Sequence, residues 1–143
     1  MHKMLELIQK TVLLLELFLC AWIDNRERMV YVWLLLPAGL FGIGVQLCLG
    51  GLSVTEMVCA TLPGVACLLL SLVTKGSIGA GDGMVLIMTG IFLGFWENLN
   101  LLVCSLMLSG ILALFLLVLK KKRRNDRLPM LPFVLVAYVG MLV

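Results

Sequence analysis

The chain has 143 residues, of which 62% are hydrophobic and 13% are charged, with a formal net charge of +3 at pH 7. Its mean hydropathy of +1.14 excludes an ordinary soluble domain, because a soluble fold must expose much of its surface to water. The composition predicts a membrane protein.

Stretches without charge follow one another along nearly the whole chain. A hydrocarbon core about 30 Å thick is crossed by roughly 17 to 25 helical residues. The candidate segments are residues 11–23, interrupted by Glu16, and residues 29–55, 57–74, 83–96, 98–119 and 128–143. We therefore predict an all-α membrane protein with about six transmembrane helices in one polytopic bundle. Residues 1–143 are expected to form a single domain, with no soluble part and no cleavable signal segment.

Basic residues distinguish the two sides of this predicted bundle. Arg26 and Arg28 follow the first segment, Lys75 follows the third, and a Lys- and Arg-rich run at 120–127 follows the fifth. The loops expected at residues 50–56 and 97–100 contain no Lys or Arg. Because cytoplasmic loops are enriched in positive charge, the basic loops are expected in the cytoplasm. We interpret the run as a lipid-headgroup anchor rather than a nucleic-acid site, since no soluble basic surface is expected beside it.

The residue types available restrict the chemistry. His2 is the only histidine, and the five cysteines are scattered through apolar segments without the two-residue spacing of metal or redox sites. This argues against a His-ligated metal and against a Ser–His or Cys–His nucleophile pair. Any reaction must depend on carboxylates, lysines or the backbone.

Two of the three aspartates border apolar segments. Asp24 ends the first segment, whereas Asp126 lies in the basic run and is interpreted as a surface ion pair. Asp82 precedes residues 83–96, which as a helix rise only about 20 Å. A span there must begin several residues earlier, which would place Asp82 inside the apolar zone. An ionisable group at that depth is costly and usually functional.

The segment before Asp82, residues 76–81, reads Gly-Ser-Ile-Gly-Ala-Gly. Glycine permits positive φ and close backbone approach, and irregular backbone at membrane depth needs protein or a water-filled cavity beside it. We therefore expect a wet pocket next to Asp82. Plainer interpretations stay open: Asp82 also suits a helix N-cap, and Asp24 also suits neutralisation of Arg26 or Arg28.

Three motifs in order resemble a known family. Residues 79–82 (Gly-Ala-Gly-Asp) resemble the GxGD signature of the type IV prepilin peptidases, which are intramembrane aspartyl peptidases. Residues 24–28 (Asp-Asn-Arg-Glu-Arg) resemble the first aspartate motif, and residues 128–133 resemble the proline-bearing start of the last span. The chain departs at residues 31–32, where many members have Pro-Asn, and at Met84, where many have Lys. It resembles the short, peptidase-only form, without the cysteine-bearing domain that is linked to methylation.

This resemblance implies a site and a substrate. Asp24 and Asp82 would be the catalytic carboxylates, sharing one proton because two close negative charges cannot both persist. The residues implied in the active-site loops or in substrate binding are Gly79, Gly81, Arg26 and Arg28. The substrate would be the leader of type IV prepilin-like proteins, cut after a glycine on the cytoplasmic side of a bacterial inner membrane. No metal or organic cofactor is implied, and the partners are the precursor and the lipid bilayer, not nucleic acid.

Two other classes of function stay open at this point. A small transporter or ion pathway also uses intramembrane acids and glycine-broken helices, although it is expected to show matched halves. A non-catalytic subunit of a membrane assembly would tolerate the loss of either aspartate.

Overall fold

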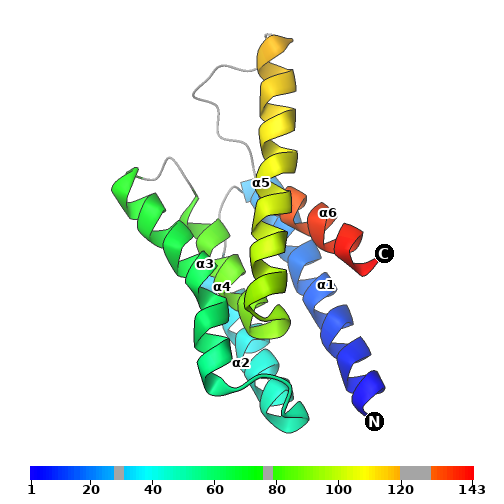
Figure 1. The fold of residues 1–143 in the computed structure, drawn as a ribbon. Helices are drawn as coiled ribbons and strands as arrows, with labels where there is room; N and C mark the ends of the chain where they lie inside the picture. The colour runs from blue at the N-terminus through cyan, green and yellow to red at the C-terminus, as the bar shows by residue number, and fades with distance from the viewer. Residues whose placement is uncertain (28–30, 76–78, 120–129) are drawn as a thin grey trace.

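The computed structural model describes residues 1–27, 31–75, 79–119 and 130–143. Within these ranges there are only helices and no strand. The helices are α1 (His2–Glu27), α2 (Val32–Leu49), α3 (Val54–Val73), α4 (Ala80–Leu93), α5 (Phe95–Val118) and α6 (Leu131–Leu142). Successive helices alternate in direction (Figure 1). The all-α prediction is confirmed for the described part of the chain.

Three of the described helices, α2, α3 and α5, are long and apolar enough to cross a membrane. Charged side chains interrupt α1, while α4 and α6 have only 14 and 12 residues. A 14-residue helix rises about 21 Å, less than the thickness of a bilayer core. The bundle therefore combines clear spans with shorter apolar helices.

Local residue chemistry explains the turn between α2 and α3. Gly50 ends α2 with φ 61°, in the left-handed region that glycine adopts at little cost. Ser53 then begins α3 with a capping box: its Oγ accepts from the backbone N–H of Glu56 at 3.3 Å, and its own N–H donates to Glu56 Oε2 at 2.7 Å. The loop predicted at residues 50–56 is therefore present, although α3 already begins at Val54.

Gly94 alone separates α4 from α5. Its φ of 87° turns the chain within one residue, and its N–H donates to the carbonyl of Gly90 at 2.9 Å. The prediction of a loop at residues 97–100 was wrong. Glu97 lies in the first turn of α5 instead, because one left-handed glycine replaces a longer connection.

Helices α3 and α4 make the most extensive helix–helix contact in the described residues. A Cβ atom at Gly64 would lie 2.5 Å from the backbone nitrogen of Ile87, and one at Gly90 would overlap the carbonyl of Ala60. Small residues at helix interfaces allow backbones to approach closely in membranes, where dispersion contacts replace much of the hydrophobic driving force. The glycines therefore set the separation of α3 and α4.

A buried amide joins this pair to α5. Asn98 Nδ2 donates to the carbonyl oxygens of Ala60 and Leu86, both at 2.9 Å, and Asn98 Oδ1 accepts from the hydroxyl of Thr89 at 2.7 Å. Asn98 and Thr89 are both 0% exposed. The network connects α3, α4 and α5 near the carboxyl-terminal half of α4.

Two glutamines hold the carboxyl-terminal end of α4. Gln9 of α1 and Gln46 of α2 both donate through Nε2 to the carbonyl of Phe92, at 2.7 and 3.0 Å. The last carbonyls of a helix lack partners within it, and burying them unpaired is costly. These side chains therefore allow a short helix to end inside the protein.

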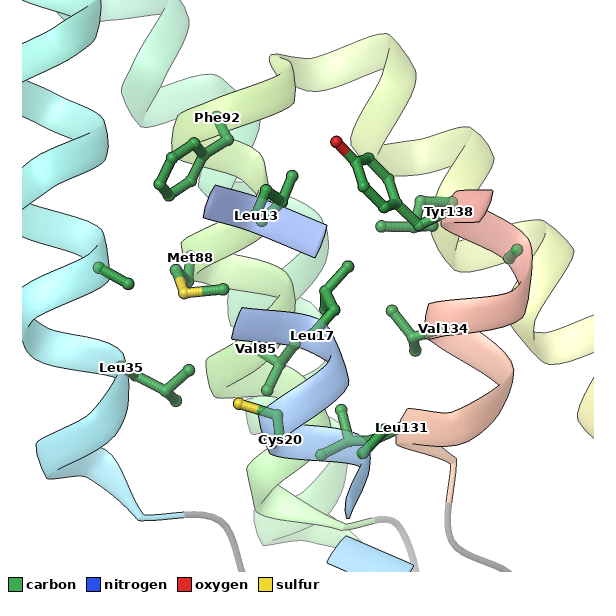
Figure 2. Packing of buried hydrophobic residues seen from close by; sticks show 14 residues of the cluster. Leu13, Leu17, Cys20, Leu35, Val85, Met88, Phe92, Leu131, Val134 and Tyr138 are labelled. Atoms are coloured by element: carbon green, nitrogen blue, oxygen red, sulfur yellow. The ribbon is translucent and has the colours of Figure 1, made fainter. Parts of the chain in front are cut away.

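The apolar core packs against the same face of α1 that carries Gln9. Figure 2 shows Leu17 between Val85 of α4 and Val134 of α6, with Leu13 and Cys20 on the same side of α1. All five side chains are at most 1% exposed. This packing fixes α1 against α4 and α6 and thereby places the carboxyl-terminal end of α1.

We predict that Asn98→Ala destabilises the bundle. Removing the amide leaves two buried carbonyls and the Thr89 hydroxyl without that partner, and buried polar contacts between membrane helices contribute about 1–2 kcal/mol. Unfolding by denaturant in detergent micelles would measure the loss. Asn100→Ala, at an exposed position of the same helix, is the control and should unfold like the wild type; equal stability of both variants would contradict this role for Asn98.

Candidate active site

The two candidate aspartates lie at the same end of the bundle. Asp24 occupies the last turn of α1, and Asp82 is the third residue of α4. Helices α1 and α4 run in opposite directions and contact each other, so the end of one meets the start of the other (Figure 1). Arg26 and Lys75 also lie at this end, as the alternation of basic and non-basic loops predicted.

The two carboxyl groups interact. Asp82 lies within electrostatic reach of Asp24, whose negative charge acts on it. Repulsion between like charges extends farther where the groups are shielded from water than it does in bulk solvent. The structure therefore brings together two residues that are far apart in the sequence.

The backbone around Asp82 differs from two sequence-based expectations. Gly79, not Asp82, is the N-cap of α4, so the N-cap interpretation of Asp82 is wrong. Gly79 has φ −64°, a value open to most residues, so positive φ does not explain the glycine. Limited space explains the glycine instead, because a Cβ at Gly79 would lie 2.8 Å from Asp82 Oδ2. The Asp82 carboxyl group folds back over the N-cap, and a side chain at position 79 would displace it.

The depth argument for Asp82 also needs correction. Helix α4 begins at Ala80, three residues before Gly83, so Asp82 lies in its first turn rather than one or two turns inside it. The side-chain exposures also reverse the expected order of burial of the two aspartates. Asp24 is 9% exposed, whereas Asp82 is half-buried. The short helix keeps Asp82 among other helices, rather than carrying it deeper along a longer span.

The remaining predicted site residues lie around the pair, with one exception. Gly81 is the second residue of α4 and half-buried, and Arg26 is exposed in the last turn of α1. Arg28 lies outside the described residues, as do positions 76–78 of the predicted wet segment. The pocket expected there stays a prediction.

A contact between Tyr31 and Glu27 links the end of α1 to the start of α2. The Tyr31 hydroxyl donates to Glu27 Oε2 at 2.5 Å. This hydrogen bond, with the negative charge that accepts it, raises the pKa of Tyr31. The chain departs from the family pattern at Tyr31, and the structure shows this residue hydrogen-bonded to the last residue of α1.

Sequence reasoning missed three neighbours of the aspartates. Cys20 lies within electrostatic reach of Glu16 and Asp24, and Cys67 lies within reach of Asp82. Glu16 Oε2 is buried without a hydrogen-bond partner among the described residues. Residues 16, 20 and 24 are spaced by four and share one helix face. This spacing is visible in the sequence, although apolar packing interrupted by one charge also accounts for it.

No group of three or more His, Cys, Asp or Glu side chains that could hold a metal ion occurs within the described ranges. Asp24 and Asp82 provide two acidic side chains, which is fewer than such a group of three. The expected independence from metals and cofactors therefore stays a prediction, and the arrangement offers paired carboxylates as its reactive groups.

A comparison with protein families decides the assignment. The model of the type IV leader peptidase family matches residues 11–118, which include both aspartates and the turn at Gly79. The chain belongs to this family. The resemblance read from the motifs is confirmed, and the helical chain is a membrane protease of the leader-peptidase type. Comparisons with curated proteins and with solved structures gave no match.

We predict that cysteines at positions 24 and 82 can be bridged. In a variant with the five native cysteines replaced, Asp24→Cys and Asp82→Cys should be linked by a short bifunctional thiol reagent, because α1 and α4 hold these positions together. Intact-protein mass spectrometry would detect a single linker joining both thiols. The control pair, Asp82→Cys with Glu97→Cys in the first turn of α5, should bind two separate linkers, because the length of α4 separates these positions. Two separate linkers on the first pair as well would contradict the arrangement.

Proposed function

We propose that the chain is an intramembrane aspartic endopeptidase in which Asp24 and Asp82 form the catalytic pair. The observation that carries this proposal is that α1 and α4 contact each other and place Asp24 and Asp82 at the same end of the bundle. Membership of a peptidase family supports it, and we take residues 1–143 as one catalytic membrane domain.

The chemistry follows from two carboxylates that share a proton. The ionised member accepts a proton from a water molecule as the water attacks the scissile carbonyl. The protonated member donates to the developing oxyanion or to the leaving amine. The pair titrates as a unit. The acid and base roles are therefore assigned to the pair and not to either aspartate alone.

The proposed substrate is the leader of a type IV prepilin-like precursor, cut after a glycine. Arg26 and Lys75, on the side of the aspartates, favour a cytoplasmic orientation of the site, in the inner membrane of a bacterium. Arg26 is exposed, and its proposed role is to contact the substrate. The reaction is proposed to need no metal, cofactor or nucleic acid. A role in transport or in assembly alone has no comparable support from the aspartate pair.

Gly79 is proposed as a positioning residue. It makes no chemical contribution of its own, but the absence of a side chain leaves the space that the Asp82 carboxyl group occupies. Catalytic groups must be held within a fraction of an ångström of their productive geometry. Gly79 therefore acts through Asp82.

Replacing either aspartate should abolish processing. Asp24→Asn and Asp82→Asn keep the side-chain shape but remove the shared proton, and loss of general acid–base catalysis lowers rates by about 100-fold or more. Co-expression with a precursor that carries a basic, glycine-ended leader would measure cleavage by gel shift. Asp126→Asn, at the remaining aspartate of the chain, is the control and should process normally. Processing that persists in both Asn variants would contradict the proposal.

Gly79→Ala should lower kcat while leaving KM near the wild-type value. The added methyl group displaces the Asp82 carboxyl group, and misplacement by about 1 Å reduces rates by roughly ten- to a hundredfold. Gly44→Ala, where a Cβ meets nothing within 4 Å, is the control. Steady-state kinetics of both variants separate the two parameters; an unchanged kcat in Gly79→Ala would show that the space is not needed.

A further inference from the structure

A cavity of about 450 Å³ lies at the end of the bundle opposite the two aspartates. Phe92, which lines the cavity, follows Asp82 by ten residues, so about 15 Å of α4 separates the two places. The first turns of α1, the end of α2 and the start of α5 also contribute to the lining, and these segments lie toward the lower end of the view in Figure 1. The cavity is therefore separate from the candidate active site.

The cavity lies at the level where two membrane spans end. Leu49 is the last residue of α2, and Val54 is the first residue of α3. Leu49 and Leu52 both line the cavity. Trp96, in the first turn of α5, is 75% exposed, and Trp side chains are enriched where the hydrocarbon core meets the headgroups. The cavity is therefore at the depth of the lipid headgroups on this side of the bilayer.

Two buried glutamines present hydrogen-bond acceptors to the cavity. Gln9 and Gln46 line it and are only 8% and 6% exposed. Their Nε2 atoms donate to the carbonyl of Phe92, while no residue in the described ranges donates to either Oε1. A Cβ at Gly51, which also lines the cavity, would lie 3.0 Å from Gln46 Oε1. Because buried polar atoms are normally hydrogen-bonded, these acceptors favour a ligand that carries donors.

Charged side chains of both signs complete the lining. Glu6 and Glu97 contribute carboxyl groups, His2 and Lys10 contribute basic nitrogens, and all four are exposed. Carboxylates and amide oxygens accept hydrogen bonds from an ammonium group, whereas a lysine pairs with phosphate. Residues 50–56 and 97–100 contain no Lys or Arg, so an enrichment of basic residues on this side does not explain Lys10. The lining is complementary to a zwitterion with an ammonium and a phosphate.

We propose that this cavity binds the headgroup of phosphatidylethanolamine. The ammonium group of the lipid donates to Gln9 Oε1 and Gln46 Oε1 and is attracted by Glu6 and Glu97, while Lys10 binds the phosphate. Phosphatidylcholine has no N–H donor on its headgroup, and phosphatidylglycerol carries a net negative charge that the two glutamates repel. The position at headgroup depth is the argument for a lipid. The inference does not rest on the proposed function, because neither aspartate lines the cavity.

Lipid selectivity tests the need for N–H donors. Phosphatidylethanolamine and phosphatidylcholine with the same acyl chains differ only in whether the headgroup nitrogen carries hydrogens or methyl groups. We expect native mass spectrometry of the purified protein in detergent to show about tenfold tighter binding of phosphatidylethanolamine, since hydrogen bonds with a charged partner are the strong ones. Phosphatidylglycerol should bind no better than phosphatidylcholine. Equal binding of the first two lipids, or a preference for phosphatidylglycerol, overturns the inference.

Charge-removing variants test the place of binding. Glu6→Gln combined with Glu97→Gln keeps the side-chain shapes and should weaken the binding of phosphatidylethanolamine by about tenfold, because two charge-assisted interactions are lost. Glu56→Gln is the matched control at the same end of the bundle: it also removes a negative charge, lies outside the cavity, and keeps a residue that suits the capping box with Ser53. An equal loss in the control, or no loss in the double variant, contradicts binding in this cavity.

A soluble competitor distinguishes a lipid from a small ammonium compound. Glycerophosphoethanolamine carries the same headgroup without acyl chains. At millimolar concentration it should leave bound phosphatidylethanolamine in place, because the acyl chains contribute apolar contacts that the soluble compound lacks. Displacement of the lipid at that concentration would assign the cavity to a soluble ligand and would show that the lipid assignment is wrong.

Discussion

The close packing of α3 against α4 is the contact on which the rest of the structure depends. Helix α4 is too short to cross a bilayer, so both of its ends must be accommodated within protein. Gly64 and Gly90 bring its backbone against α3, and Asn98 adds a buried network that includes α5. Gln9 and Gln46 pair with the carbonyl of Phe92 at its end. A short, fully supported helix is what allows an aspartate to lie at its start.

The site follows from this central helix and from the direction of α1. Since α1 packs against α4 through Leu17 and Val85 (Figure 2), its last turn carries Asp24 to the start of α4. The space at Gly79 then lets the Asp82 carboxyl group fold back over the N-cap. Rigid helices, rather than loops, therefore position both carboxyl groups, which is the arrangement that a reaction needing a shared proton requires.

The two lateral faces of α4 differ in what they contact. One side of this helix packs closely against α3, while the side toward α2 leaves an apolar groove of about 290 Å³. The groove is lined by positions 84, 87, 88 and 91 of α4, which the helical repeat places on the face opposite Asp82.

The sequence by itself predicted the helices and the loops that carry basic residues. Apolar segments separated by Glu56 and Lys75 predicted most helix ends approximately, and the Gly-Ala-Gly-Asp motif singled out Asp82. Only the tertiary structure decided that Asp24 is more buried than Asp82, that Gly94 alone separates α4 from α5, and that the Asp82 carboxyl group lies over Gly79. Local patterns report the preferences of neighbouring residues. The partners of a side chain on another helix depend on packing between distant segments, which no local pattern contains.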